Sequence, residues 1–161
     1  MGTEIERKFL VRGDGWRRRA DRGTEIRQGY LAGSEAGSVR VRVAAGRAAL
    51  NIKSATLGVR RLEYDYPIPL PDAEQMLERL CMKPLIEKRR YRVPVGDHIW
   101  EVDLFHGANE GLILAEIELA REDEPFRLPD WAGEEVSHDP RYYNTCLVSH
   151  PYREWRDSAS R

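Results

Sequence analysis

Glu4-Ile5-Glu6-Arg7-Lys8-Phe9 places Glu4, Glu6 and Lys8 at every second position near the start of the chain. In a β-strand, successive side chains point to opposite faces, so these three residues would share one face and Ile5 and Phe9 the other. Carboxylates about 7 Å apart along a strand suit a divalent cation, and an adjacent lysine suits the anion that this cation carries. The same alternation is also typical of the solvated face of an antiparallel sheet.

The composition is that of a single charged domain. The chain has 161 residues, of which 33% are charged and 41% hydrophobic, and its formal net charge is -1. This length is enough to bury a core, and the charge balance speaks against a broad basic surface for nucleic acid. Residues 1–4 lack a signal-peptide pattern, no apolar run reaches membrane-spanning length, and Cys81 and Cys146 form no CxxC motif. The sequence therefore predicts a cytoplasmic protein without nucleic-acid or membrane partners.

Strand signals dominate the chain and predict a mainly β fold. The expected strands lie at 3–12, 25–32, 38–44, 47–53, 58–67, 85–94, 98–105 and 112–120. Short glycine-containing turns between several of them predict antiparallel neighbours. Helical segments are expected after Pro71-Asp72 and between residues 139 and 155. One domain would then cover residues 1–156, followed by a frayed tail at 157–161.

Charged residues recur at every second position in most of these strands. The positions are Arg40 and Arg42; Lys53; Arg61, Glu63 and Asp65; Lys88, Arg90 and Arg92; Glu101 and Asp103; and Glu116 and Glu118. Such recurrence predicts a sheet with one strongly polar face of mixed sign. This face lies either in water, with helices covering the other face, or inside a closed barrel.

Two short helical segments are too few to cover the apolar face of eight strands, which favours the barrel. A barrel with its charges inside would leave part of an apolar outer wall exposed. We expect homodimerisation to cover that wall.

Charges that line an interior need partners of opposite sign. Two like charges about 4 Å apart repel by about 4 kcal/mol at an effective dielectric constant of 20. Clustered carboxylates therefore call for a hard divalent cation such as Mg²⁺ or Mn²⁺, and clustered lysines and arginines call for an anion. A metal-chelated phosphate chain satisfies both groups, because arginine binds phosphate oxygens in a bidentate manner.

Taken together, these motifs resemble the CYTH superfamily, the triphosphate tunnel metalloenzymes. The match begins with the ExExK signature, here Glu4-x-Glu6-x-Lys8. It continues through Val39-Arg40-Val41-Arg42, Ile52-Lys53, Leu62-Glu63-Tyr64, Glu87-Lys88-Arg89-Arg90-Tyr91, Glu101-Val102-Asp103 and Ala115-Glu116-Ile117-Glu118-Leu119. The resemblance covers nearly the whole chain, to about Trp155.

The resemblance implies an eight-stranded antiparallel closed barrel with a few flanking helices, whose tunnel holds Mg²⁺ or Mn²⁺ and a triphosphate. The implied metal ligands are Glu4, Glu6, Glu116 and Glu118, and the implied phosphate-binding residues are Lys8, Arg40, Arg42, Lys53, Lys88 and Arg90. The implied catalytic set consists of Glu4, Glu6, Lys8, Glu63, Asp103 and Tyr30. Within it, Tyr30 matches a partner of the signature lysine, whereas Glu63 and Asp103 match acidic tunnel positions whose role stays open.

The short chain looks most like the compact prokaryotic branch of the superfamily, whose members resemble inorganic tripolyphosphatases. The expected reaction is metal-dependent hydrolysis of tripolyphosphate to pyrophosphate and phosphate. Alternatives are a class IV-type adenylate cyclase and a thiamine or nucleoside triphosphatase. A non-catalytic protein that binds triphosphate or polyphosphate is the alternative of another class.

Overall fold

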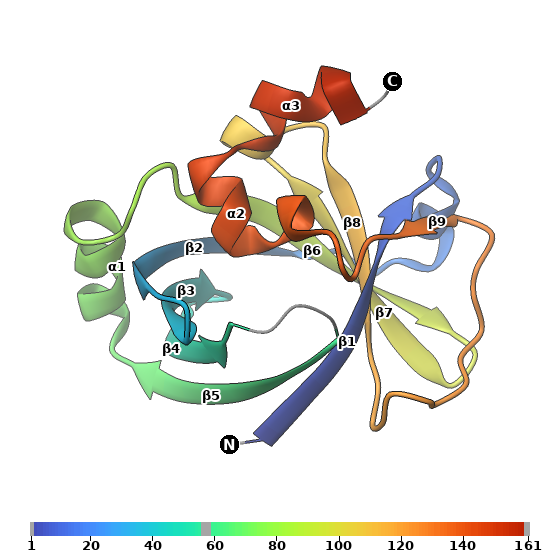
Figure 1. Ribbon diagram of the computed structural model, residues 1–161, viewed down its shortest axis with the longest axis horizontal. Coiled ribbons are helices and arrows are strands. Elements are labelled where there is room, and N and C mark those ends of the chain that lie inside the picture. The colour runs from blue at the N-terminus through green and yellow to red at the C-terminus, as the bar shows by residue number, and fades with distance from the viewer. Residues whose placement is uncertain (1, 56–58, 160–161) are drawn as a thin grey trace.

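The protein forms a closed antiparallel barrel with a ninth strand outside it (Figure 1). The computed structural model describes residues 2–55 and 59–159, with side chains to residue 156. The barrel strands are β1 (Gly2–Val11), β2 (Thr24–Gly33), β3 (Gly37–Ala44), β4 (Arg47–Ser54), β5 (Arg60–Ile68), β6 (Ile86–Val95), β7 (His98–Phe105) and β8 (Ile113–Glu118). The outer strand is β9 (Ala132–Glu135), which pairs with β1.

Strand β1 closes the barrel. Its residues Gly2–Ile5 pair with β5, whereas Glu6–Leu10 pair with β8, so the two ends of the sheet meet on one strand. Closure removes the free edges of the sheet and turns one face of every strand inward. The predicted barrel and its eight strands are therefore confirmed, and β9 is an addition that the sequence pattern did not indicate. Residue 58, the predicted start of the fifth strand, lies outside the described residues.

The helices lie on the outer wall and over one end of the barrel. The α-helices are α1 (Leu70–Arg79), α2 (Asn144–Ser149) and α3 (Tyr152–Ala159). Three 3-10 helices, η1 (Gly15–Arg19), η2 (Gly107–Asn109) and η3 (Pro140–Tyr142), complete the elements. The predicted frayed tail overlaps the last turn of α3, while residues 160 and 161 fall outside the described part of the chain. None of the described helices is long and apolar enough to cross a membrane.

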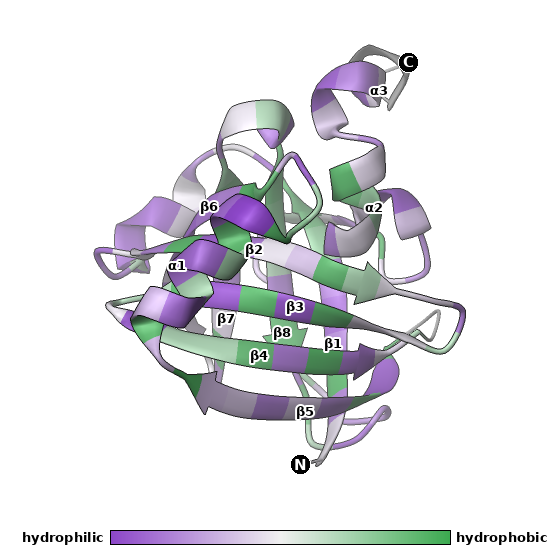
Figure 2. Ribbon diagram, turned by 90° about the vertical axis from the view of Figure 1, so that its left-hand side faces the viewer, coloured by the Kyte–Doolittle hydropathy of each residue, from purple (hydrophilic) through white to green (hydrophobic). Residues whose placement is uncertain are grey.

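Tight turns fix the register between neighbouring strands. The β3–β4 connection is the two-residue turn Ala45-Gly46, with φ angles of 52° and 73°. Positive φ at both positions is the geometry of a type I′ hairpin turn, whose twist matches that of the flanking strands. The resulting register places Arg40 opposite Asn51 and Arg42 opposite Ala49 on the inner face. The alternation of hydrophilic and hydrophobic residues along β3 and β4 is visible in Figure 2.

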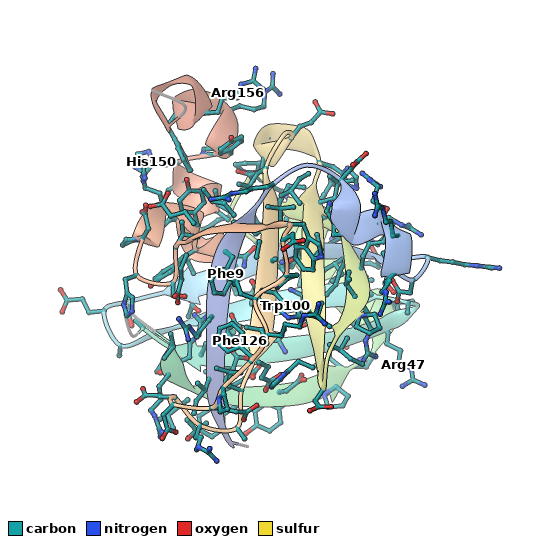
Figure 3. All side chains as sticks on the ribbon, turned by 90° about the vertical axis from the view of Figure 1, so that its right-hand side faces the viewer. Phe9, Arg47, Trp100, Phe126, His150 and Arg156 are labelled. Carbon is teal, nitrogen blue, oxygen red and sulfur yellow. The ribbon has the colours of Figure 1, made fainter. Side chains whose placement is uncertain are left out.

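The hydrophobic core lies outside the barrel wall. On one side, Trp100 and Phe9 pack with ring centroids 5.3 Å apart, and Phe126 lies over both rings (Figure 3). Phe126 belongs to the irregular segment 119–131, and Trp16 of η1 joins the same cluster. On the other side, α1 buries Leu77 against β3 and β4.

Helices thus cover only part of the apolar wall of the barrel. An irregular segment with strong aromatic content performs much of this task, because aromatic rings bury a large area without regular backbone.

The outer cluster carries a stability prediction. Trp100 is fully buried, so Trp100→Ala should lower the free energy of unfolding by about 3–5 kcal/mol through lost burial and a residual cavity. Its neighbour Ile99 faces the other way and is 47% exposed, so Ile99→Ala should change stability by less than about 1 kcal/mol. Urea denaturation of both variants checks this, and equal losses would contradict the assignment of the core.

Candidate active site

The barrel encloses a polar cavity of about 240 Å³. Of the residues predicted from the sequence, those that line it are Glu4, Glu6, Lys8, Tyr30, Arg40, Arg42, Lys53, Glu63, Arg90, Glu116 and Glu118. They come from all eight barrel strands except β7, which contributes Glu101 instead. The alternation in the sequence thus becomes a single enclosed set of charges, because closure turns every inward-facing residue toward the same axis.

Carboxylates gather where β1, β8 and β7 run side by side. Glu6 lies directly opposite Glu118, and Glu116 lies directly opposite Glu101. Burial raises the pKa of Glu6, and the nearby carboxylates of Glu116 and Glu4 raise it further. The pKa values of Glu118 and Glu101 are also raised, first by burial and then by acidic neighbours. This side of the cavity therefore carries more negative charge than its own cations neutralise.

Glu116 differs from its acidic neighbours. Burial alone would raise its pKa, but Lys8, Arg90 and Lys88 lower the pKa well below its usual value. The Glu116 carboxylate lies 3.5 Å from Lys8 Nζ and 3.5 Å from Arg90 Nη2. It therefore marks the boundary between the acidic and the basic parts of the cavity.

The arginines of β3 are held by amides instead of carboxylates. Arg40 donates from Nε and Nη2 to Asn51 Oδ1, at 3.1 and 2.9 Å, and Arg42 Nε donates to Gln28 Oε1 at 3.1 Å. Burial lowers the pKa of Arg42 to about 10, with Arg40 and Arg90 adding to the effect. Neutral partners fix the direction of the two side chains, and neither guanidinium forms an ion pair with a described carboxylate, which suits an anion-binding site.

Two predicted residues, Lys88 and Asp103, are buried on the inner face of the barrel but do not line the cavity. Lys88 Nζ is 2.7 Å from Asp103 Oδ2, and both side chains are almost fully buried. Asp103 also accepts two hydrogen bonds from Arg90, at 2.7 and 2.8 Å, because β6 and β7 place these residues directly opposite. Burial would raise the pKa of Asp103, but Arg90 and Lys88 lower it to about 2. Asp103 is thus a positioning residue for Arg90.

Lys88 also contacts the segment that covers one end of the barrel, here called the closing segment, which consists of η3 and α2 (residues 140–149). Its Nζ lies 3.4 Å from Asn144 Oδ1, at the start of α2. Burial lowers the pKa of Lys88 to about 7, although Asp103 opposes this shift. Lys88 is absent from the described cavity lining, and its direct contact with phosphate stays a prediction.

The signature lysine finds its partners in the same closing segment. Lys8 Nζ lies 3.3 Å from the carbonyl oxygen of Tyr142 and 5.5 Å from the ring centre of Tyr143. Tyr30, the predicted partner of Lys8, lines the cavity, but the contacts of Lys8 in the described part of the chain are Tyr142, Tyr143 and Glu116. The segment packs on the barrel end through Tyr142, Leu147 and other buried apolar residues, as its place above the barrel in Figure 1 indicates.

The sequence reading missed several lining residues. They are Ser38, Asn51, Arg61, Glu101, Tyr143, Asn144 and Thr145. Arg61 and Glu101 belong to the alternating stripes, so the signal was present and was not used. Ser38 and Asn51 are neutral, which hides them from a charge pattern. The last three enter from a segment whose position depends on tertiary packing alone.

The carboxylates of the cavity are suitable ligands for a hard cation. In this structure, lysine and arginine side chains contact them instead. Carboxylate oxygens alone suit Mg²⁺ or Mn²⁺. Among the side chains described, those of residues 2–55 and 59–156, no three from His, Cys, Asp or Glu are grouped so as to hold an ion. Glu4 instead contacts Lys53 Nζ at 3.2 Å, and Arg61 contacts both Glu4 and Glu6.

Comparison with known proteins agrees with this geometry. The family model of the CYTH domain matches residues 2–143. The chain belongs to the CYTH domain family. This CYTH chain is 48% identical to an inorganic triphosphatase of Acetivibrio thermocellus, with 98% of the chain and 100% of the relative covered. An inorganic triphosphatase of Nitrosomonas europaea is 37% identical, with 91% and 97% covered.

A solved structure supports the same placement. The crystal structure of the inorganic triphosphatase NE1496 superposes on the CYTH chain with a TM-score of 0.65 at 35% identity. The alignment covers 92% of this chain and 95% of that one. The barrel, the ninth strand and the closing segment therefore belong to a fold with a solved counterpart.

The raised pKa of Glu6 predicts a pH effect on stability in metal-free buffer. The unfolded chain loses this proton near pH 4.5, whereas the folded protein keeps it to higher pH. Folded protein then binds more protons, so stability falls as pH rises from about 4.5 through the folded pKa. Glu6→Gln removes this loss, and its stability relative to wild type should rise over that interval. Urea denaturation with a chelator present checks this, and a relative fall would refute the charge crowding.

Proposed function

We propose that this CYTH protein is a divalent-metal-dependent inorganic triphosphatase that hydrolyses tripolyphosphate to pyrophosphate and phosphate inside its barrel. The observation that carries the proposal is the pair Arg40 and Arg42, held by amides and not by ion pairs with described carboxylates, in the same cavity as the carboxylates of Glu4, Glu6, Glu116 and Glu118. The near full-length identity to two inorganic triphosphatases supports the same reaction.

The basic side of the cavity would bind the phosphate chain. Arg40, Arg42 and Arg90 offer guanidinium forks, which match phosphate oxygens in two directions at once. Lys8 and Lys53 add point charges from β1 and β4. Phosphoryl transfer depends mainly on positioning and charge neutralisation, so these groups would absorb the charge that develops on the departing pyrophosphate.

The acidic side would hold the metal. Glu4, Glu6, Glu116 and Glu118 provide oxygen ligands, and the raised pKa values of Glu4, Glu6 and Glu118 indicate negative charge that a cation would relieve. A bound Mg²⁺ or Mn²⁺ supplies Lewis-acid neutralisation of phosphate charge. Either ion satisfies the same oxygen donors, so the preference between them stays a prediction for experiment.

The reaction itself breaks one phosphoanhydride bond. A water oxygen attacks the terminal phosphorus, and the bridging oxygen leaves with its electron pair on pyrophosphate. Glu63 lines the cavity, and its Oε1 lies 3.8 Å from Lys53 Nζ. It is therefore placed to orient that lysine or the attacking water. Asp103 is too deeply buried for this and acts by holding Arg90 in position.

The size of the cavity favours an inorganic substrate over the alternatives. Pockets for drug-sized ligands occupy about 300–1,000 Å³ and are largely apolar. The barrel cavity of about 240 Å³ is smaller and is lined almost entirely by charged and polar side chains. An adenylate cyclase, a thiamine triphosphatase or a nucleoside triphosphatase would have to place its organic group outside this cavity. A non-catalytic binding protein would use the same charges without turnover.

The remaining expectations stay predictions. Both cysteines are free, as expected for a cytoplasmic protein, although the compartment itself is not thereby fixed. A homodimer would use what remains of the exposed apolar wall, where Leu62 and Tyr66 of β5 are 51% and 53% exposed.

A substrate panel tests the reaction. We expect rapid phosphate release from tripolyphosphate with Mg²⁺ or Mn²⁺, slow release from pyrophosphate, and none with a chelator, because two phosphates cannot span both sides of the cavity. ATP, GTP and thiamine triphosphate should be poorer substrates. Cyclic AMP from ATP would favour the cyclase, and tight tripolyphosphate binding without turnover would favour the non-catalytic alternative. Glu116→Gln should remove most of the activity.

A matched arginine pair tests the phosphate site. Arg42→Ala should lower kcat/KM for tripolyphosphate by about 10²-fold, since a buried guanidinium that stabilises phosphate charge is lost. Arg92 continues the charged stripe of β6, but it is exposed and lies outside the cavity lining. Arg92→Ala should therefore leave the kinetics within about twofold of wild type. Steady-state phosphate release measures both, and equal losses would contradict the site.

A further inference from the structure

Arg61 connects the two carboxylates at the start of the signature strand. In the β1–β5 register it lies directly opposite Glu4. Its Nε is 3.4 Å from Glu4 Oε1, and its Nη2 is 3.2 Å from Glu6 Oε1. The Arg61 side chain is 23% exposed, against 8% and 15% for the two carboxylates. One guanidinium therefore neutralises part of the charge of two glutamates inside the barrel.

Glu6 depends on this arginine more than Glu4 does. Glu4 also contacts Lys53 at 3.2 Å, whereas Arg61 is the partner of Glu6 among the ion pairs of the described residues. Burial would lower the pKa of Arg61, but Glu6 and Glu4 raise it, so the guanidinium stays charged. A divalent cation at Glu4 and Glu6 would meet this positive charge at short range, and like charges repel.

The Arg61 side chain also borders a second cavity. A neighbouring cavity of about 430 Å³, here called the vestibule, is lined by Gly33, Ser34, Gly37, Ser38, Ser54, Ala55, Arg61, Tyr143 and Thr145. Arg61 lines both the barrel cavity and the vestibule. Six of the other eight described residues that line the vestibule are glycine, serine or alanine, so only small side chains from these positions face Arg61 on this side. Arg61 thus stands at the boundary between the carboxylates and an open space.

We propose that Arg61 is an internal counter-ion that competes with the metal for Glu4 and Glu6, and that it moves to the phosphate chain when the metal binds. This inference rests on the proposed function, because it takes the metal and the triphosphate as ligands of the same cavity. It assigns Arg61 two successive partners, first the carboxylates and then a phosphate oxygen. Metal binding alone is then weakened by Arg61, whereas substrate binding is strengthened by it.

The neighbouring arginine provides a matched control. Arg60 and Arg61 are adjacent on β5 and face opposite sides of the wall, and Arg60 is 55% exposed with Glu122 at 3.6 Å. Isothermal titration with Mn²⁺ alone, without phosphate, should show about tenfold tighter binding to Arg61→Gln than to wild type. Tripolyphosphate KM at saturating Mn²⁺ should rise about tenfold in the same variant. Arg60→Gln should change both quantities by less than about twofold.

The directions in which Mn²⁺ affinity and tripolyphosphate KM change in Arg61→Gln decide whether the proposal holds. Unchanged or weaker Mn²⁺ binding in Arg61→Gln would overturn the competition, since it would mean that Arg61 holds the carboxylates in place for the metal. An unchanged KM would overturn the transfer to phosphate. If Arg61→Gln does not fold, Arg61→Met decides: its side chain is long but uncharged, so tighter Mn²⁺ binding than wild type supports the proposal and equal or weaker binding overturns it.

Failure of the proposed function would be recognised separately. A wild-type protein that does not turn over tripolyphosphate with any metal would disprove the triphosphatase. The Mn²⁺ titration of Arg61→Gln would still give its own answer in that case. Titration with inorganic tripolyphosphate would then replace KM as the measure of phosphate binding, with weaker binding to Arg61→Gln expected and unchanged binding counting against the transfer.

Discussion

Opposite charges enclosed within one closed sheet are the constraint on which the rest of the structure depends. Charges taken out of water need partners or a ligand, because isolated buried ions are strongly destabilising. The barrel meets this need fully at Asp103, which lies between Arg90 and Lys88. It meets the need only in part at Glu6, Glu118 and Arg42, whose pKa values are shifted by burial and by neighbours of like charge. The incompletely neutralised residues are those that face the cavity.

This distribution separates the structural from the ligand-binding charges. Asp103 and Lys88 are buried outside the cavity lining, where they form a rigid support. A buried ion pair is tolerated there because additional hydrogen bonds satisfy its polar atoms. Asn51 and Gln28 orient Arg40 and Arg42, and because these amides are neutral, they do not cancel the positive charge of the arginines. Neutral amides orient the arginines without cancelling their charge, so the site is preorganised for an anion. A bound anion would relieve the repulsion among Arg40, Arg42 and Arg90, which strengthens its binding.

A charged interior moves the hydrophobic core to the outside of the barrel. Trp100, Phe9 and Phe126 on one side and Leu77 of α1 on the other provide the burial that the interior lacks. The cost of enclosing charges is thus offset by apolar clusters that lie on the opposite face of the same strands. The alternation within each strand serves both purposes, since inward charges alternate with outward residues, many of which are apolar.

The sequence by itself determined the strands, their alternation and the inward set from Glu4 to Glu118, because a side-chain period of two is a local property of each strand. It also carried the family resemblance, which the match over residues 2–143 confirms. Only the tertiary structure decided which inward residues reach the cavity. Lys88 and Arg90 share the inward face of β6, yet Lys88 is fully buried outside the cavity lining and Arg90 lines the cavity, since strand tilt and neighbouring side chains set the depth of each position. The same holds for Tyr143 and Asn144, which come to the barrel end through packing of the closing segment, and for Arg61, whose partners lie on a strand more than fifty residues away in sequence. Contacts between distant segments depend on closure of the whole sheet, and a local pattern contains no information about that closure.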